Sequence, residues 1–317
     1  MESPLPSMMA VLAAALALAG PASAAHKTTP AQVASGASGC ARDCLDALAD
    51  RFLDAMVARA PAGLPWAGTV RYSENSVPMM IGDGVWATLT DHSKSPLRAT
   101  DPSTGEVVWI GDVGEHGQPG FLALRLRIVG GKIADAEAVI RRKGGPAQYG
   151  DPEHYTHDPA FGSAGGGGLS RARLVAVVDG YFDAVQGKPG ARPQIAAGCA
   201  RLDNGVPTTS GDTADGGVTG CAAQLKAGVF KPIVRVRARR FPVVDEVRGV
   251  VVAAGFFDLP ATSPKPPAGK GLAWAADYPY SLGFIAAFKI RDGGVYRVDT
   301  ISNAQPYLMP SPWGGAQ

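Results

Sequence analysis

The chain has 317 residues, of which 46% are hydrophobic and 18% are charged, as in an ordinary globular protein. Its 30 basic and 28 acidic residues nearly balance, so no overall field favours nucleic acid or an anionic membrane surface as a partner. This length is too great for one small core and suits two domains of about 130 residues each.

Residues 1–24 have the features of a secretory signal peptide. An apolar run, Met8–Gly20, precedes the small-residue cleavage site Ala22–Ala24, although no Lys or Arg comes before the run. The run is too short to span a membrane comfortably, which argues against the alternative of an uncleaved anchor. We therefore predict a secreted or periplasmic protein that does not associate with a membrane after cleavage.

The 4 cysteines of an exported chain predict two disulfides. Cys199 and Cys221 flank a polar, glycine-rich loop, and closing a loop of that size contributes on the order of 3 kcal/mol. Cys40 and Cys44 lie at the start of a helix, where they pair only if the first turn is unwound. A zinc site of four thiolates is the alternative, but neither pair has the C-x2-C spacing.

An amphipathic helix, a Gly/Pro-rich stretch and a short strand follow one another twice in the chain. The two amphipathic helices are predicted at Cys44–Ala60 and Leu174–Val185, and each strand ends in an acidic residue followed by asparagine, Asn75 or Asn204. Because the repeat is as long as a domain, it predicts two tandem modules and not a solenoid.

The first module is predicted at residues 40–145 and the second at 170–310. Residues 146–169 lack periodicity and end in a run of glycines, which is typical of a linker. The insertion 259–281 of the second module is rich in proline and glycine and is predicted to form a long surface loop. Strands of the first module are expected near Val70–Glu74, Gly84–Leu89, Glu106–Val113, Gly120–Val129 and Lys132–Arg141, with antiparallel hairpins joining the last three.

Four segments carry a resemblance to known proteins: CLDALADRFLDAMVA, ENSVPMMIGDGVWAT, RRFPVVDEVRGVVVAAGFFD and PYLMPSPW. They resemble the SnoaL/ketosteroid-isomerase-like superfamily, also called nuclear transport factor 2-like. More narrowly, they resemble a family of secreted two-module proteins of bacteria and fungi that is largely without assigned function. The resemblance implies an α+β fold in which each module is a cone, with its N-terminal helix packed on a curved antiparallel sheet. This cone hosts isomerases, dehydratases, lyases and binding modules, so the resemblance alone does not give the reaction.

The motifs of common cofactor and hydrolase sites do not occur in the sequence. It contains no G-x-x-x-x-G-K-[ST], no G-x-G-x-x-G between strand and helix, no H-E-x-x-H and no G-x-S-x-G. His154–Asp158 has the elements of a small metal site, but these residues lie in the predicted linker, without fixed geometry. We expect no cofactor and no metal.

Acid–base chemistry in a cone needs a carboxylate or histidine and a donor for the developing oxyanion. Tyr72 and Glu74 alternate onto one face of a strand, so both can meet one ligand, and Asp203 is the counterpart of Glu74 in the second module. The structural alternative is that Glu74 and Asn75 cap a turn, as Asp203 and Asn204 do again.

His92 and Arg240 complete the catalytic candidates. His92 follows a predicted strand at the rim of the cone, where it is either a catalytic base or an ordinary polar surface residue. Arg240 is predicted on the apolar face of an alternating strand, so it needs an anionic ligand or an internal ion pair with Asp245 or Glu246.

Aromatic residues are candidates for substrate binding. They fall on the predicted cone walls or on the insertion, where they are expected to form a lid: Trp86, Trp109, Tyr181, Phe257, Trp274 and Tyr278. Aromatic side chains on cone walls are more often core than ligand platform, which is the alternative here.

The sequence thus predicts a cofactor-independent lyase or isomerase/dehydratase that acts on an apolar or aromatic small molecule. The alternatives are a non-catalytic exported ligand-binding module, or a protein in which packed side chains fill both cones. A cavity of a few hundred cubic ångströms beside a buried carboxyl or histidine of shifted pKa favours the enzyme.

Overall fold

The computed structural model describes Met1, residues 39–261 and residues 278–314. The predicted signal peptide beyond Met1, and Trp274 of the insertion, lie outside these residues. Within the described ranges, no helix is both long enough and apolar enough to cross a membrane.

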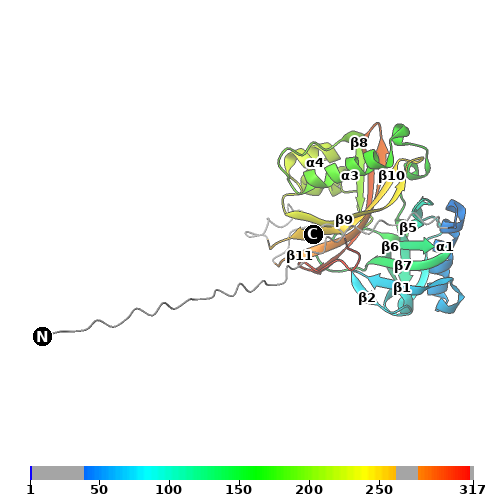
Figure 1. Cartoon of the computed structure of the whole chain (residues 1–317). Coiled ribbons are helices and arrows are strands. Elements are labelled where there is room, and N and C mark those ends of the chain that lie inside the picture. Colours follow the sequence, from blue (N-terminus) through cyan, green and yellow to red (C-terminus); the bar gives the residue numbers. More distant parts are fainter. Residues whose placement is uncertain (2–38, 262–277, 315–317) are drawn as a thin grey trace. The chain divides into compact units, whose positions relative to one another are not determined.

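The first sheet has seven strands in the order β2-β1-β7-β6-β5-β3, with β4 paired to β5 (Figure 1). Two helices accompany this sheet, α1 (Arg42–Val57) and the short α2 (Val85–Thr88). The strands are β1 Trp66–Glu74, β2 Val77–Met79, β3 Leu89–His92, β4 Leu97–Asp101, β5 Glu106–Glu115, β6 Gln118–Val129 and β7 Lys132–Arg141.

The second sheet has five strands in the order β8-β12-β11-β10-β9. Figure 1 shows its helices, α3 (Arg171–Val185) and α4 (Cys221–Ala227), close together on the same side of this sheet. The strands are β8 Ile195–Asp203, β9 Arg235–Asp245, β10 Val250–Leu259, β11 Tyr280–Arg291 and β12 Gly294–Pro306. The predicted α+β class is therefore confirmed.

Both sheets are mixed, so the prediction of purely antiparallel sheets is wrong. β1 runs parallel to β7, and β8 runs parallel to β12. In each case the strand that follows the long helix lies beside the last strand of its sheet. A parallel neighbour must be reached through a crossover, and strand periodicity in the sequence does not reveal which distant strand that neighbour is.

The strand predicted at Gly84–Leu89 is also wrong. Residues Val85–Thr88 form α2, and β3 begins only at Leu89. The carboxylate of Glu74 accepts a hydrogen bond of 2.5 Å from the backbone N–H of Val85, so it satisfies a free donor at the start of this turn.

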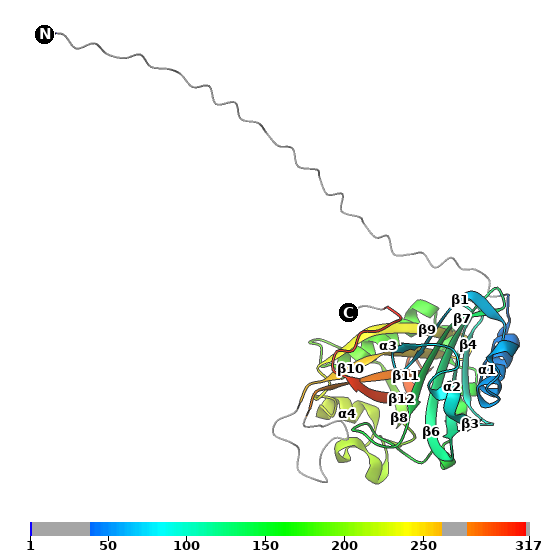
Figure 2. The ribbon, with the colours of Figure 1, turned by 90° about the horizontal axis from the view of Figure 1, so that it is seen from below.

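Three hydrophobic cores hold the fold together. In the first helix–sheet core, α1 buries Leu45 and Phe52 against the first sheet, and in the second helix–sheet core, α3 buries Phe182 against the second sheet. The third, which we call the inter-sheet core, joins the two sheets. Figure 2 shows the first sheet between α1 and the second sheet.

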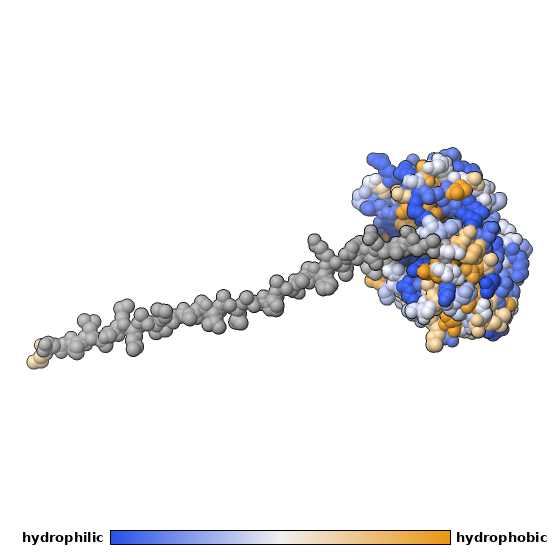
Figure 3. Space-filling view, turned by 45° about the vertical axis from the view of Figure 1, so that its right-hand side comes forward, coloured by the Kyte–Doolittle hydropathy of each residue, from blue (hydrophilic) through white to orange (hydrophobic). Residues whose placement is uncertain are grey.

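The inter-sheet core explains why the central strands are buried on both faces. On β5, Val107 and Trp109 contribute to the first helix–sheet core, whereas Val108 and Ile110 contribute to the inter-sheet core. Ile285 of β11 meets them from the second sheet. Figure 3 shows one outer face, where hydrophilic residues surround small hydrophobic patches.

Both predicted disulfides are confirmed. Cys199 of β8 is bonded to Cys221 at the start of α4, with their Cα atoms 5.7 Å apart. Cys40 is bonded to Cys44, with Cα atoms 5.3 Å apart, and Cys40 precedes α1, so this pair does not interrupt the helix.

The segment predicted as a linker, residues 146–169, is packed against both sheets. Short 3-10 turns form at Pro152–His154 and Pro159–Gly162, and the first begins with the Asp151 side chain accepting the N–H of Glu153. Phe161 is buried in the inter-sheet core. We call residues 146–169 the connecting segment.

Candidate functional site

The aromatic candidates of the first half lie in the first helix–sheet core. Trp86 and Trp109 are 1% and 0% exposed, and the ring of Trp86 lies edge-on to Phe52 with the ring centroids 4.8 Å apart. Tyr72 is also buried, and burial is the main cause that raises the pKa of its hydroxyl far above the usual range. These aromatic side chains therefore belong to the core, as the alternative interpretation predicted.

Both carboxylate oxygens of Glu74 are occupied. One oxygen accepts the Val85 N–H, and the other accepts a hydrogen bond of 3.0 Å from Arg142. Arg142 also forms an ion pair of 2.7 Å with the nearly buried Glu115. A carboxylate so engaged is a poor general base, because a substrate proton would have to compete with these donors.

Asn75 and Asn204 perform the same structural task in the two sheets. Each has a backbone φ of 47°, a left-handed conformation that asparagine tolerates better than most residues. The side-chain oxygen of Asn75 accepts the N–H of Ile140 at 3.1 Å, and that of Asn204 accepts the N–H of Ser302 at 2.8 Å. Each asparagine therefore ties the end of a parallel strand to the last strand of its sheet.

His92 and Arg240 are not brought together with Glu74 by any contact in the described ranges. His92 lies at the end of β3, and its Nε2 is 3.0 Å from a carboxylate oxygen of Asp54 on α1. Arg240 donates hydrogen bonds of 2.6 and 3.1 Å to Glu137 of β7.

The internal ion pair of Arg240 is therefore present, but its predicted partners are wrong. Asp245 pairs with Arg42 at 2.8 Å instead, and Glu246 accepts the backbone N–H of Arg171. The regular alternation predicted for this strand is interrupted at Ala238, whose φ of 50° marks a change of register between β9 and β10. A bulge of this kind redirects the side chains that follow it.

In the second half, three of the predicted residues lie around one small cavity, which we call the chamber. Asp203, Tyr181 and Phe257 all line it, and its volume is about 20 Å³. Most of the remaining lining is apolar: Phe182, Val185, Phe230, Ile233, Ala286, Phe288 and Val298. Tyr278, the fifth of the aromatic candidates that the structure describes, is exposed and does not line the chamber.

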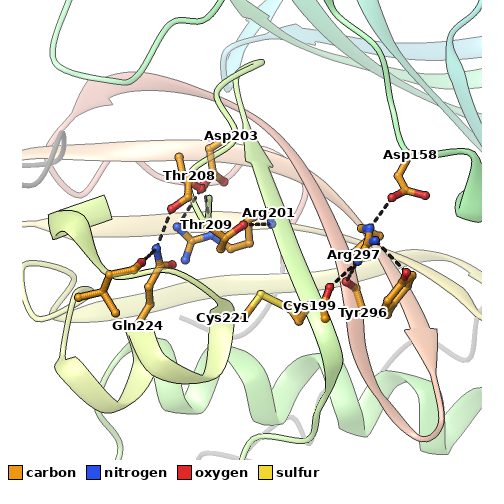
Figure 4. Close-up of a disulfide and its surroundings, with 12 residues drawn as sticks. Asp158, Cys199, Arg201, Asp203, Thr208, Thr209, Cys221, Gln224, Tyr296 and Arg297 are labelled. Carbon is orange, nitrogen blue, oxygen red and sulfur yellow. Dashed lines mark hydrogen bonds and ion pairs between the residues drawn. A yellow bond between two sulfur atoms is a disulfide. The ribbon is translucent and has the colours of Figure 1, made fainter. Parts of the chain in front are cut away.

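Arg201 supplies the polar end of the chamber, and sequence reasoning missed it. Its guanidinium donates to Asp203 at 3.2 Å and to Thr208 at 3.0 Å (Figure 4). It also donates to Asp215 at 2.5 Å. It also lies over the ring of Phe230, 4.5 Å from the centroid. The remaining nitrogen, Nη1, is buried and has no hydrogen-bond partner among the described residues.

Burial sets the protonation equilibria around Arg201. The loss of water raises the pKa of the Asp215 carboxyl to about 6, although the charge of Arg201 opposes this rise. Burial likewise raises the pKa of the Tyr181 hydroxyl. The nearby carboxylates outweigh burial for Arg201 itself, whose pKa is raised, so the guanidinium stays charged.

The disulfide Cys199–Cys221 closes the loop that surrounds Arg201. Figure 4 shows it below Arg201, joining β8 to α4. Gln224 of α4 donates to the carbonyl of Thr208 at 2.7 Å, so helix and loop are also tied by a hydrogen bond. Alternation along β8 places Cys199, Arg201 and Asp203 on one face, a signal that the sequence contained.

Comparison with known proteins finds one family model that matches part of the chain. Residues 168–302 match the model of the family described as "Domain of unknown function (DUF8021)". No protein of curated function matches the chain.

Two similar solved structures each match part of this chain. One, from Kribbella flavida, is provisionally named a ketosteroid isomerase; it is 16% identical, and the match covers 37% of this chain and 91% of that protein, with a TM-score of 0.27. Another, from Xanthomonas campestris pv. campestris, is provisionally named a polyketide cyclase; it is 20% identical, and the match covers 42% of this chain and 92% of that protein, with a TM-score of 0.29. Scores this low carry no argument about the reaction.

Proposed function

We propose that the second half of the chain binds a small apolar molecule that carries a carbonyl or carboxylate oxygen. The observation that carries the proposal is the buried Nη1 of Arg201, which donates to no carboxylate, beside a chamber whose walls are mostly apolar. A buried guanidinium with a spare N–H takes an oxygen acceptor, whereas the walls take an apolar body.

Binding is favoured over catalysis by the state of the Asp203 carboxylate. Asp203 accepts from Arg201 at 3.2 Å and from Thr208 at 2.5 Å, both at Oδ2, and these two donors stabilise its ionised form and make it a weaker base. A cofactor-independent isomerase or lyase is the second candidate, favoured by Asp215. Its pKa of about 6 suits an acid or base near neutral pH once the hydrogen bonds from Arg201 and Gln148 are released, and Arg201 would stabilise an enolate oxygen.

The chamber must enlarge to admit such a ligand, since about 20 Å³ holds little more than one water molecule. An open groove of about 550 Å³ lies beside it, between the end of α3 at Ala184 and Leu225 of α4. Phe230, which follows α4, lines the chamber itself. A shift of α4 and Phe230 is therefore the expected route of entry.

The proposal includes export and a two-module organisation. The two disulfides fit an oxidising compartment. The matching roles of Asn75 and Asn204, each at the end of a strand parallel to the last strand of its sheet, support two related modules at residues 40–145 and 170–310. The proposed partners are small molecules, and neither nucleic acid nor a membrane is among them.

A matched ligand series tests the proposal. We would measure the affinity of naphthalene, 2-acetylnaphthalene and 2-naphthoic acid for the full chain by calorimetry and by ligand-observed NMR. The two oxygen-bearing ligands should bind at least tenfold more tightly than the hydrocarbon. In Arg201→Lys, which keeps the charge but removes the forked donor, this preference should shrink.

Arg235→Lys is the control, because Arg235 is half-exposed on β9 and pairs with Asp258, away from the chamber residues. Phe230→Ala should strengthen binding of all three ligands by enlarging the chamber. Equal affinity for the three ligands in the wild type would contradict the proposal. Conversion of a bound ketone, seen as deuterium exchange next to its carbonyl that Asp215→Asn abolishes, would establish the enzymatic candidate instead.

A further inference from the structure

A second opening lies on the other face of β8, between this strand, β12 and the connecting segment; we call it the segment cleft. Its volume is about 320 Å³. Thr156, His157 and Phe161 form one side, and Leu202 and Asp299 form part of the other. Because side chains alternate along a strand, Asp203 points into the chamber while Leu202 points to the segment cleft, and the long side chain of Arg201 lines both openings.

Asp299 is an acid without a counter-ion. The residue is 1% exposed, and one of its carboxylate oxygens accepts a hydrogen bond of 2.7 Å from the hydroxyl of Tyr155. The other oxygen, Oδ1, is buried and has no partner in the described part of the chain. No Lys or Arg of residues 39–261 and 278–314 forms an ion pair with it.

Burial raises the pKa of Asp299 to about 7, and the negative charge of Asp203 adds to the rise. The hydrogen bond from Tyr155 acts in the opposite direction but does not compensate for the lost water. A buried carboxylate normally gains a cation or gives up its charge. Near neutral pH, Asp299 is therefore present in both its protonated and its ionised form.

The nearest arginine on the same strand face does not serve as the counter-ion. Arg297 is paired with Asp158 and donates to the carbonyl oxygens of Gly198 at 2.7 Å and Tyr296 at 2.9 Å (Figure 4). Its guanidinium is held at the rim of the segment cleft by these contacts. The positive charge available at this site is thus already used.

His157 provides a second acceptor. It is half-buried, and burial is the main cause that lowers its pKa, so the imidazole is neutral at pH 7. Its Nδ1 is buried and finds no hydrogen-bond partner within the described ranges. Phe161, Leu202 and Pro207 add apolar surface to the same opening.

We propose that the segment cleft is a second binding site, which takes a small organic cation: a primary ammonium group on a compact apolar body. The ammonium would pair with Oδ1 of Asp299 and donate to His157, and the body would lie against Phe161 and Leu202. A metal ion fits less well, because no three His, Cys, Asp or Glu residues of the described chain are close enough together to hold one. An ammonium needs only the two acceptors that are present.

Binding by this route is coupled to proton release. A cation binds the ionised carboxylate, so at pH 6 complex formation must expel the proton that Asp299 carries. The lowered pKa of His157 reduces its protonation in the same range, and the pKa of Asp158 is lowered by its hydrogen bond from Arg297. The pH dependence of affinity should therefore report on Asp299.

The probes are 2-phenylethylamine and its neutral counterpart 2-phenylethanol. We would titrate each into the full chain by calorimetry at pH 6.0 and pH 8.0, in buffers of different ionisation enthalpy. The amine should bind about tenfold more tightly at pH 8.0 and release close to one proton at pH 6.0. The alcohol should bind more weakly and without dependence on pH.

Asp299→Asn should remove both the pH dependence and the preference for the amine, and it should fold, because an amide oxygen still accepts from Tyr155. Glu153→Gln is the matched control: like Asp299→Asn it removes one negative charge, but Glu153 is exposed on the connecting segment and does not line the segment cleft. Equal binding of amine and alcohol, or amine binding that Asp299→Asn leaves unchanged, would overturn the proposal. Phe230→Ala should not alter the result, because Phe230 lines the chamber and not the segment cleft, so this site can fail or succeed independently of the chamber.

Discussion

Arg240 of β9 and Glu137 of β7 form an ion pair that crosses from one sheet to the other, with two hydrogen bonds of 2.6 and 3.1 Å. Glu137 also lies 3.5 Å from Arg125, which is itself buried beside Glu106. The strand that the sequence offered as a source of catalytic arginine thus contributes to the attachment of the two sheets. Arg240 therefore has a structural role.

Removing this arginine should destabilise the whole chain. Arg240→Ala leaves Glu137 buried with a weaker partner, and we expect a loss of about 2–4 kcal/mol in the free energy of unfolding. Urea denaturation measures the loss. Arg235→Ala is the control: Arg235 is half-exposed and its partner Asp258 keeps Arg237, so the loss should stay below about 1 kcal/mol. Equal losses in the two variants would show that the Arg240–Glu137 ion pair contributes no more to stability than the half-exposed pair of Arg235.

The two strand-end asparagines should respond alike to substitution. Asn75→Ala and Asn204→Ala each lose hydrogen bonds and force alanine into a left-handed conformation, so each should cost about 2–3 kcal/mol. Asn75→Gly and Asn204→Gly keep the backbone conformation and lose only the hydrogen bonds, so their cost should be smaller by about 1 kcal/mol. Thermal denaturation of the four variants tests this; alanine and glycine of equal cost would refute the backbone part of the explanation.

The two disulfides should differ in their contribution to stability because they close loops of different length. The bond Cys199–Cys221 spans 22 residues and Cys40–Cys44 spans 4. In the chain-entropy relation, replacing both cysteines of the longer loop by alanine costs about 3 kcal/mol, against about 2 kcal/mol for the shorter loop. Denaturant titrations of the two double variants give the comparison. A reversed order would mean that contacts, and not loop entropy, dominate.

Stability should fall as the pH rises from about 4 to about 7, because Asp299 binds its proton more tightly in the folded chain than in the unfolded chain. The pKa of Asp299 is raised to about 7, so the folded state holds more protons than the unfolded state across this window. Asp299→Asn should flatten the dependence and be more stable than the wild type at pH 8. Some slope should remain, since the pKa of Asp215 is raised in the same direction, to about 6.

Urea titrations at pH 5 and pH 8 measure this difference. Asp151→Asn serves as the comparison, because Asp151 is exposed and the hydrogen bond from His154 lowers its pKa. If the wild type and Asp299→Asn lost stability equally between the two pH values, Asp299 would not be the group responsible.

Local sequence patterns predicted the elements that depend on interactions between residues close together in the sequence. Apolar spacing gave both long helices, and alternation with a glycine turn gave the strand Lys132–Arg141 at its observed bounds. Cysteine spacing gave the disulfide Cys199–Cys221, because a polar loop between two cysteines is a local feature. The repeated acid–asparagine pair predicted a turn that each sheet then uses.

Long-range partners were not predictable in this way. Tyr155 and Asp299 are 144 residues apart, and nothing near Tyr155 indicates that its hydroxyl meets a buried carboxylate. The composition of His154–Asp158 is that of a small metal site, but the lack of periodicity around this segment does not indicate that it makes fixed contacts. Arg240 was recognised as an arginine in need of a partner, but Glu137 could be found only once the two sheets were placed together.

The apolar surface by which the two sheets meet has a consequence for any fragment of this protein. Val108 and Ile110 on one side and Ile285 on the other would be bare if either half were synthesised separately, so each fragment should self-associate or precipitate. Fusion in one polypeptide makes their encounter intramolecular and keeps the partner at high effective concentration. Solubility of each half is thus conferred by the other.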